Sequence, residues 1–359
     1  MDRLARVIAL YLPQYHPTPE NDAWWGRGFT EWRNVAKAKP LYPGHQQPKL
    51  PADLGYYDLR VAETRAAQAD MARAHGIEAF CYYHYWFGGR EMLERPFNEV
   101  LAAGDPDFPF CLCWANESWT GVWAGQPRQT LLEQVYPGPE DHAAHFEHLL
   151  PAFRDARYLR VDGKPVFFIY RPMQIAEREQ FIAQWQDLAR QAGLGGFYFI
   201  GVNHRQQPWD PRTAGFDGAV AHRLPDTRPW ISRRDPARWL RYKMQAWRGW
   251  PTVHRYEEVM REPVVDHVPG ADVFPTVFPN WDTTARHGTR GNVIEGCDPE
   301  LFAGQVRRAV DMLRDRPLDK RLLIVKSWNE WAEGNYLEPD QVTGMGYLEA
   351  LRREIVRAG

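Results

Sequence analysis

The chain has 359 residues, of which 44% are hydrophobic and 25% are charged, and its formal net charge is -2. This length suits one large domain or two of ordinary size, the composition excludes global disorder, and the charge gives no reason to expect nucleic acid as a partner. The aromatic fraction of 14%, with 16 tryptophans, is unusual, because core packing accounts for only some of these rings.

Eight short apolar segments, nearly all followed by a helical pattern, predict a parallel sheet covered by helices. We expect strands at Val7–Leu12, Glu78–Trp86, Phe108–Glu117, Pro165–Tyr170, Phe197–Val202, Gly218–Ala221, Val273–Phe278 and Leu322–Val325. Eight such units, in a chain somewhat longer than ~250 residues, fit an α/β fold of the (β/α)8 TIM-barrel type, in a single domain over residues 1–359. A doubly wound open sheet is the alternative, but its Gly-rich phosphate turn is missing after the first strand.

The excess length falls in two loops, after the first and the sixth strands. The first, Pro17–Tyr57, is dense in aromatic residues and is expected to fold onto the barrel as a lid or wall. The second, Pro225–Pro269, is rich in Arg and Trp and carries helical patches. Asp298 and Pro299 predict the start of a helix, as an N-cap followed by proline at the first helical position.

The cysteines and the N-terminal residues indicate in which cellular compartment the protein is expected. We expect all four thiols to be reduced and structural, because no His/Cys group has the spacing of a zinc site. Val7–Leu12 is too short for the apolar region of a signal peptide, and no apolar run approaches the ~18 residues of a membrane span. A cytoplasmic protein without a cofactor is therefore expected. The cysteines are Cys81, Cys111, Cys113 and Cys297.

In such a barrel the active site lies at the carboxyl ends of the strands. Almost every predicted strand here ends in polar or aromatic residues, which can hydrogen-bond to hydroxyl groups and stack on sugar rings. Polar residues that merely mark solvent boundaries explain single cases, but explain the repetition poorly. The candidate substrate-binding residues are Tyr15, His16, Trp32, His84, Tyr85, Trp86, Trp114, Asn116, Glu117, Tyr170, Arg171, Asn203, His204, Trp281, Asp282, Trp328, Trp331 and Glu338. No metal site is expected, since the histidines form no compact ligand cluster.

The stretch Ser327–Asp340 follows the last strand and carries three glutamates among tryptophans and a tyrosine. Sugar-cleaving sites combine these groups, because flat rings bind the C–H faces of a sugar and carboxylates move protons at the glycosidic bond. Glu330 and Glu333 are therefore the candidate catalytic residues. A neighbouring carboxylate and aromatic burial would keep one of them protonated near neutral pH. The alternative is that one of them is only a salt-bridge partner of Lys326, Arg171 or a nearby arginine.

Glu117 is a rival to this pair. It ends the third predicted strand in an Asn-Glu dipeptide, as Glu330 does after the eighth. Glu117 could act with Glu330 across the barrel mouth, and a separation of ~5–5.5 Å or ~6.5–9.5 Å would then indicate retention or inversion at the anomeric carbon. Substrate binding is the alternative role for Glu117.

Six motifs resemble one known family over nearly the whole chain. They are Tyr11–His16, Phe29–Trp32, Tyr82–Trp86, Cys113–Glu117, Val161–Pro165 and Ser327–Gly334. Together they look like the WbsX-like family, which is commonly labelled a glycosyltransferase of lipopolysaccharide biosynthesis. The last motif is also similar to that of glycoside hydrolase family 99, the endo-α-mannosidase and mannanase family, whose fold is a (β/α)8 barrel.

The resemblance to family 99 implies roles for the two glutamates. Glu330 would be the base that acts on the substrate 2-hydroxyl, and Glu333 would be the general acid at the leaving oxygen. The 2-hydroxyl would attack the anomeric carbon to give a 1,2-anhydro intermediate, which water opens with net retention. The chain departs from the hydrolases at Ala332, where they often carry His.

The sequence favours hydrolysis or transglycosylation over nucleotide-dependent transfer. The one Asp-x-Asp match of note, Asp105–Asp107, precedes the third strand and so lies on the opposite face of the barrel from the site. No P-loop or Gly-rich dinucleotide turn is present. We expect a glycoside hydrolase acting on a bacterial surface polysaccharide or its oligosaccharide. The alternatives are a glycosyltransferase of lipopolysaccharide or O-antigen assembly and a carbohydrate-binding barrel without catalysis.

Overall fold

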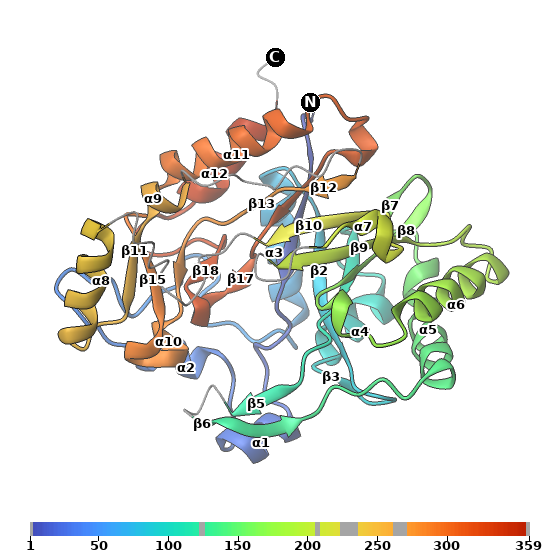
Figure 1. Cartoon of the computed structure of the whole chain (residues 1–359), viewed down its shortest axis with the longest axis horizontal. Coiled ribbons are helices and arrows are strands. Elements are labelled where there is room, and N and C mark those ends of the chain that lie inside the picture. Colours follow the sequence, from blue (N-terminus) through green and yellow to red (C-terminus); the bar gives the residue numbers. More distant parts are fainter. Residues whose placement is uncertain (1–2, 122–125, 205–208, 223–235, 261–270, 357–359) are drawn as a thin grey trace.

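The computed structural model describes residues 3–121, 126–204, 209–222, 236–260 and 271–356. Nine parallel strands fill the eight positions of a barrel (Figure 1), which confirms the predicted (β/α)8 fold. In ring order they are β1 (Arg6–Tyr11), β2 (Ile77–Trp86), β4 (Phe110–Trp114), β8 (Lys164–Ile169), β9 (Tyr198–His204), β10 (Gly218–His222), β12 (Asp272–Phe274) with β13 (Thr276–Val277), and β16 (Leu322–Val325).

The seventh position holds two strands because Pro275 interrupts it. We predicted one strand over Val273–Phe278, but proline has no N–H to donate to a sheet. Its carbonyl still accepts a hydrogen bond from the Ile324 N–H at 3.0 Å. β12 pairs with β10 and β13 pairs with β16, so the two short strands together close the ring.

The helices cover the outside of the barrel (Figure 1). In chain order they are α3 (Ala62–Ala74), α4 (Arg95–Ala103), α5 (Pro139–Arg154), α6 (Arg178–Gln191), α7 (Pro211–Ala214), α11 (Pro299–Leu313) and α12 (Gly346–Ile355). The Asp298 carboxylate accepts hydrogen bonds from the N–H groups of Glu300 and Leu301, so the predicted N-cap of α11 is confirmed.

The loop after β1 forms one wall of the barrel mouth. It contains α1 (Pro19–Trp25) and α2 (Trp32–Lys37), neither of which the sequence pattern predicted as a helix. The Trp32 ring lies 5.5 Å from that of Trp331, and its indole N–H donates to the Tyr57 carbonyl at 2.7 Å. The loop therefore packs against the segment that follows the last barrel strand.

The loop after β10 contributes one strand to a small second sheet, whose other two strands follow β13. Its described part contains α8 (Pro236–Trp247), β11 (Thr252–Arg255) and α9 (Tyr256–Met260), and the rest of Pro225–Pro269 lies outside the described residues. β11 pairs with β15 (Asn292–Glu295), which pairs with β14 (Trp281–Asp282). The α10 helix (Thr284–His287) follows β14.

Short strands complete the structure. The hairpin of β5 (Trp119–Gly121) and β6 (Gln126–Leu132) extends beyond β4, where we had expected one strand to continue to Glu117. The remaining pieces are β3 (Glu91–Met92), β7 (Arg160–Val161), β17 (Asn329–Glu330) and β18 (Asn335–Tyr336).

All four cysteines are free thiols, and three of them are buried in the barrel wall. Among the helices that the structure describes, none combines the length and the apolar character needed to cross a bilayer.

Two glycines, one in a barrel strand and one in an outer helix, allow a paired test of how tightly the barrel is packed. A Cβ on Gly201 of β9 would lie 2.5 Å from the Trp209 ring, whereas a Cβ on Gly304 of α11 would meet nothing within 4 Å. We expect Gly201→Ala to lower the free energy of unfolding by about 1–3 kcal/mol through overpacking. Gly304→Ala should raise it by about 0.5–1 kcal/mol, because alanine favours the helix. Urea unfolding of both variants checks this, and similar effects of the two would contradict the packing.

Candidate active site

A cavity of about 330 Å³ opens at the carboxyl ends of the barrel strands. Five of the predicted site residues line it, namely Tyr85, Glu117, Tyr170, Glu330 and Glu333. Much of the remaining wall consists of aromatic rings, which belong to Trp24, Trp25, Tyr83 and Trp119. The cavity therefore combines carboxyl groups with flat apolar surfaces, as a sugar-binding site requires.

Hydrogen bonds to the end of β1 fix the segment that carries the two glutamates. The Asn329 side chain accepts from the Leu12 N–H at 2.7 Å and donates to the Leu12 carbonyl at 3.1 Å. The Tyr15 hydroxyl donates to the Asn329 carbonyl at 2.6 Å and accepts from the Trp331 N–H at 3.0 Å. Tyr15 and Asn329 thus hold the backbone on both sides of Glu330.

Gly334 lets this segment turn tightly against β14. Its φ of +52° is in the left-handed region, which favours glycine. A Cβ there would lie 2.9 Å from the backbone N and O of Asp282. Any side chain at this position would push the short helical turn Trp331–Glu333 away from β14, and would move the Glu333 carboxyl with it.

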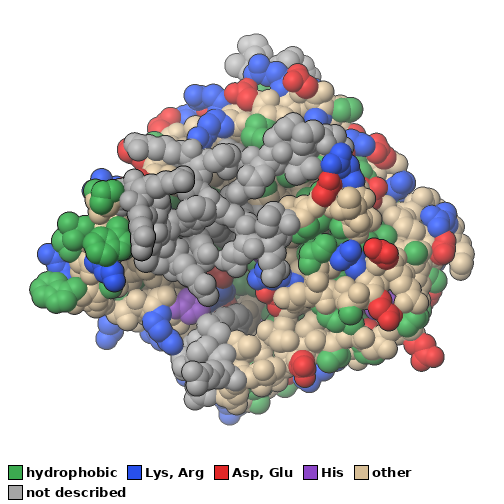
Figure 2. Space-filling model, in the orientation of Figure 1, with side chains coloured by type: hydrophobic (Ala, Val, Ile, Leu, Met, Phe, Trp, Pro, Cys, Tyr) green, Lys and Arg blue, Asp and Glu red, His purple; other side chains and the backbone are tan. Residues whose placement is uncertain are grey.

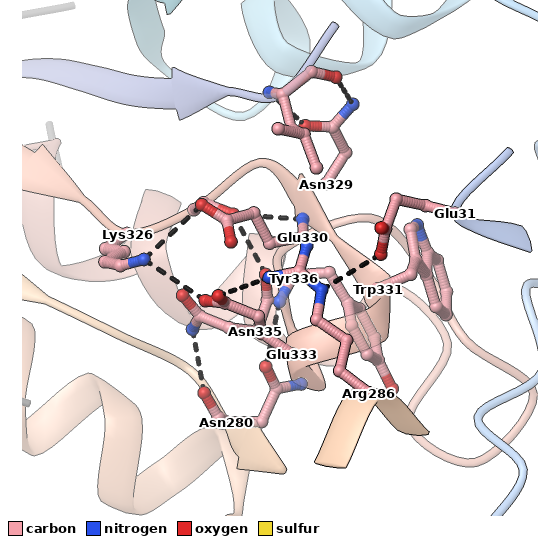
Figure 3. Close-up of polar contacts among 12 residues, drawn as sticks. Glu31, Asn280, Arg286, Lys326, Asn329, Glu330, Trp331, Glu333, Asn335 and Tyr336 are labelled. Atoms are coloured by element: carbon pink, nitrogen blue, oxygen red, sulfur yellow. Dashed lines mark hydrogen bonds and ion pairs between the residues drawn. The ribbon is translucent and has the colours of Figure 1, made fainter. Parts of the chain in front are cut away.

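Two buried cations hold the carboxyl pair (Figure 3). The Lys326 Nζ lies 3.4 Å from Oε1 of Glu330 and 3.4 Å from Oε2 of Glu333. The Arg286 guanidinium pairs with Glu333 at 2.5 Å and, on its other side, with Glu31 at 3.1 Å. The Glu31 side chain is fully buried, so this is a desolvated network of ions between the loop after β1, α10 and the last strand end.

The two glutamates are in opposite protonation states. Burial, and then the neighbouring Glu333 carboxylate, raise the pKa of Glu330 to about 8. Burial also favours a neutral Glu333, but Lys326 and Arg286 outweigh it and hold the pKa of Glu333 well below its ordinary value. The pair therefore holds one proton at neutral pH, and that proton is on Glu330.

The pair is more compact than the acid pairs of ordinary glycosidases. The Glu330 and Glu333 carboxyl groups lie close enough to interact directly, and the same Lys326 Nζ is 3.4 Å from an oxygen of each. This direct contact is closer than the ~5–5.5 Å or ~6.5–9.5 Å that separates acids on two sides of a scissile bond. Glu117 lies in the same cavity and pairs with Arg171 at 2.5 Å, so it remains a candidate for an acid on the other side of a bound sugar.

Glu338 and Trp331 lie beneath this segment and are not brought to the cavity. The Trp331 ring stacks on Tyr336 at 3.8 Å, and its indole N–H donates to Glu338 at 2.6 Å. Glu338 also accepts from the Tyr57 hydroxyl at 2.9 Å and from the Gln68 amide at 2.6 Å. Burial raises the pKa of Glu338 to about 7. Both residues support the backbone that carries the pair.

Alternate residues of β2 face opposite sides of the barrel wall. Tyr83 and Tyr85 line the cavity, so His84 and Trp86 point outward to the helices. The His84 Nε2 lies 2.8 Å from Nε2 of His145 on α5, and the Trp86 ring stacks on His145 at 4.7 Å. The structure does not bring these two candidates to the cavity.

Trp114 and Trp328 are also buried away from the cavity. The Trp114 ring packs 5.6 Å from Phe181 of α6, and the Trp328 ring packs 5.1 Å from Phe80 of β2. Both side chains are almost fully excluded from solvent. Their large rings fill space in and around the barrel wall, which is a common role for tryptophan.

Several other candidates brace the strand ends. Asn116 accepts from the Arg171 N–H at 2.8 Å and donates to its carbonyl at 3.0 Å, which ties the end of β4 to that of β8. His204 contacts the Tyr170 carbonyl at 2.9 Å, and Asn203 donates to the Trp209 carbonyl at 3.0 Å. The loop residues Tyr15 and Trp32 are buried in contact with each other at 4.6 Å, and His16 is buried beside them.

Trp281 and Asp282 lie between the site and a second cavity of about 720 Å³. Lys326 Nζ lies 5.3 Å from the centre of the Trp281 ring, so Trp281 separates the buried lysine from the second cavity. Asp282 accepts from the Gln47 amide at 2.7 Å and contacts the His45 ring at 2.8 Å. It therefore fixes the loop after β1 to β14.

Sequence reasoning missed Arg286 as a site residue and named Lys326 only as a salt-bridge partner. It also missed Glu31, which lies inside the Phe29–Trp32 motif. Arg286 follows β14 at the end of the seventh strand position, so its place at a strand end was the available signal. The ion pairs that join these residues span 47 and 255 positions in the chain and leave no local pattern.

The barrel thus carries a cavity of carboxyl groups and aromatic rings at the carboxyl ends of its strands. Residues 7–351 match a protein family that is described as "Glycosyltransferase WbsX", and the chain belongs to this family. Two Xanthomonas campestris proteins, each called "Uncharacterized protein WxcX", are 38% identical over 358 and 362 residues. Each match covers 99% of this chain and 50% of the relative, so the chain spans about half the length of these curated relatives.

Two solved structures share the fold. A "Glycoside hydrolase-like protein" aligns with a TM-score of 0.60 and 16% identity, over 99% of this chain and 95% of the other. The GH99 endo-alpha-mannosidase from Bacteroides thetaiotaomicron aligns with a TM-score of 0.56 and 16% identity, over 97% and 96% of the two chains. At these identities the likeness shows the barrel alone.

The buried ion network predicts strong coupling between Glu31 and Arg286. Arg286→Met should cost about 3–5 kcal/mol of unfolding free energy, because it leaves the buried Glu31 carboxylate without its cation and Glu333 with Lys326 alone. Adding Glu31→Gln should recover part of this loss, since one of those charges is then gone. A double-mutant cycle by urea unfolding measures the coupling.

The exposed pair Arg353–Glu300 is the matched control for that cycle. Arg353→Met should cost at most about 1 kcal/mol, because solvent screens this pair. Additive effects of Glu31→Gln and Arg286→Met would contradict the network.

Proposed function

We propose that this chain is a glycoside hydrolase that cleaves a glycosidic bond in a bacterial surface polysaccharide or in an oligosaccharide derived from it. The observation that carries the proposal is the Glu330–Glu333 pair, which holds one proton in a cavity lined by aromatic rings. Hydrolysis needs a neutral acid to protonate the leaving oxygen and an anion nearby to stabilise positive charge at the anomeric carbon. Family membership and the shared barrel fold support the broader class of carbohydrate-active enzymes, to which both hydrolases and transferases belong.

The protonation of the free enzyme favours roles opposite to those implied by the resemblance. Glu330 carries the proton, so in this proposal it is the general acid at the leaving oxygen. Glu333 is held ionised by Lys326 and Arg286, so it acts as the anion that accepts a proton or stabilises the oxocarbenium-like transition state. Glu117 binds substrate hydroxyls across the cavity.

The second candidate function is glycosyl transfer, which the description of the matching family favours. The two functions differ in the donor, because a transferase uses an activated sugar. Calorimetry with a panel of nucleotide sugars distinguishes them. Tight binding of one of them, abolished by Glu330→Gln, would support transfer, whereas release of reducing ends from a polysaccharide without any donor supports hydrolysis.

Removal of either carboxyl group tests the catalytic assignment. A screen for the release of reducing ends first identifies a polysaccharide that the protein cleaves. On this substrate, Glu330→Gln and Glu333→Gln should each lower kcat by about 10²–10⁴-fold. Glu117→Gln should act mainly on KM, because the proposal gives it a binding role. Glu300→Gln, on α11, is the control and should change neither constant. Full activity in either variant of the pair would sink the proposal, provided that circular dichroism shows native folding.

The pH profile of kcat/KM tests which glutamate is the acid. Glu330 must be protonated to donate, so activity should fall as the pH rises through about 8. Glu333 must be ionised, and its lowered pKa places the loss at the acid end below pH 4.5, the ordinary value for glutamate. A plateau from about pH 5 to 7.5 is therefore expected. A profile without a basic limb would show that the proton of Glu330 is not used.

A further inference from the structure

The α8 helix contacts the protein through hydrogen-bonding side chains. The Tyr242 hydroxyl lies 2.8 Å from Nδ1 of His254, and the Gln245 amide exchanges two hydrogen bonds with the Val253 backbone, at 3.1 and 3.2 Å. Tyr242 and Gln245 are the two buried residues of the helix. The inner face of α8 is thus polar and is held against β11 without a large apolar contact.

The outer face of α8 is apolar. Trp247 is 84% exposed, Leu240 54%, Met244 43% and Trp239 40%. Leu240, Met244 and Trp247 have the spacing of one helical face. Figure 2 shows hydrophobic side chains gathered at the left edge of the molecule, where Figure 1 places α8. An ordinary surface helix has the opposite arrangement, with its apolar side turned to the core.

Positive charge borders this apolar face. The described positions 236–260 contain four arginines and one lysine against two glutamates, and one of these, Glu258, pairs with Arg238 and Arg241. Within α8 and just after it, Lys243 lies 5.7 Å from the Trp239 ring and Arg248 lies 4.9 Å from the Trp250 ring. Lys243 and Arg248 are both exposed. The cations therefore lie at the edge of the exposed aromatic surface.

We propose that α8 docks this protein onto an anionic lipid surface. Tryptophan and leucine enter the boundary between headgroups and acyl chains, while lysine and arginine beside them attract anionic headgroups. The exposed cations Lys243 and Arg248, which lie beside the exposed aromatic rings, make this face complementary to a negatively charged bilayer. The helix lies in the plane of the membrane and does not enter its core, because its inner face remains bonded to β11.

This docking would also orient the candidate active site. α8 follows β10, and the cavity opens at the carboxyl ends of the same strands, so both lie at one end of the barrel. A protein held by α8 would present that end near the headgroups. The inference concerns lipid binding alone and does not depend on which reaction the cavity performs.

Vesicle flotation tests the proposal with purified protein. Vesicles of phosphatidylcholine are compared with vesicles that contain about one-third phosphatidylglycerol, at low and at high salt. Binding is expected only to the anionic vesicles and should weaken with salt. Trp247→Ala should lower the partition coefficient about tenfold, and Lys243→Glu with Arg248→Glu should lower it at least about 25-fold, at about fivefold per lost cation.

Matched substitutions elsewhere on the surface control for general effects. Leu318 is 49% exposed, nearly as much as Leu240, and Arg314 is an exposed cation on the barrel side of the molecule. Leu318→Ala and Arg314→Glu should leave vesicle binding within about twofold. Equal loss in these controls, or no binding to anionic vesicles at low salt, would overturn the proposal. So would a dimer, seen by light scattering, that Trp247→Ala dissociates, because the face would then be a contact between two copies.

Discussion

The site depends on the pairing of Arg286 with Glu31 on one side and Glu333 on the other. This one guanidinium joins the loop after β1, α10 and the segment after β16, three parts that are far apart in the chain. With Lys326 it provides the positive charge that keeps Glu333 ionised although it is buried. Burial then leaves the remaining proton on Glu330. Loop structure and acid chemistry are therefore fixed by the same interaction.

The sequence predicted the barrel well because its strands are fully apolar and its helices are amphipathic, two patterns that depend on local spacing. Pro275 was visible, but its division of the seventh strand depends on pairing with two different neighbours. The direction of each side chain was harder. Tyr85 and Trp86 both looked suited to sugar binding, and only the alternation along β2 decides that Tyr85 lines the cavity.

The candidate site was predicted in part. Glu330, Glu333 and Glu117 do line one cavity, as their places after β16 and β4 indicated. Whether they catalyse stays a prediction. Arg286 offered only its place after β14 as a signal, and the ion pair that joins it to Glu31 has no periodicity along the chain. Glu338 looked like a third site acid, but three hydrogen-bond donors hold it beneath the segment.

The buried charges also bear on the kind of ligand that would fit the proposed site. Glu31 and Glu333 balance Arg286 and Lys326, and Glu330 is neutral, so the floor of the cavity has no net charge. A uronic acid or a phosphorylated sugar in contact with Lys326 would compete with Glu333 for its cation. It would thereby raise the proton affinity of Glu333 and remove the difference between the two acids. In the proposed hydrolysis, an uncharged pyranose ring beside Glu330 and Glu333 would therefore leave the balance of buried charges intact, whereas an anionic ring would disturb it.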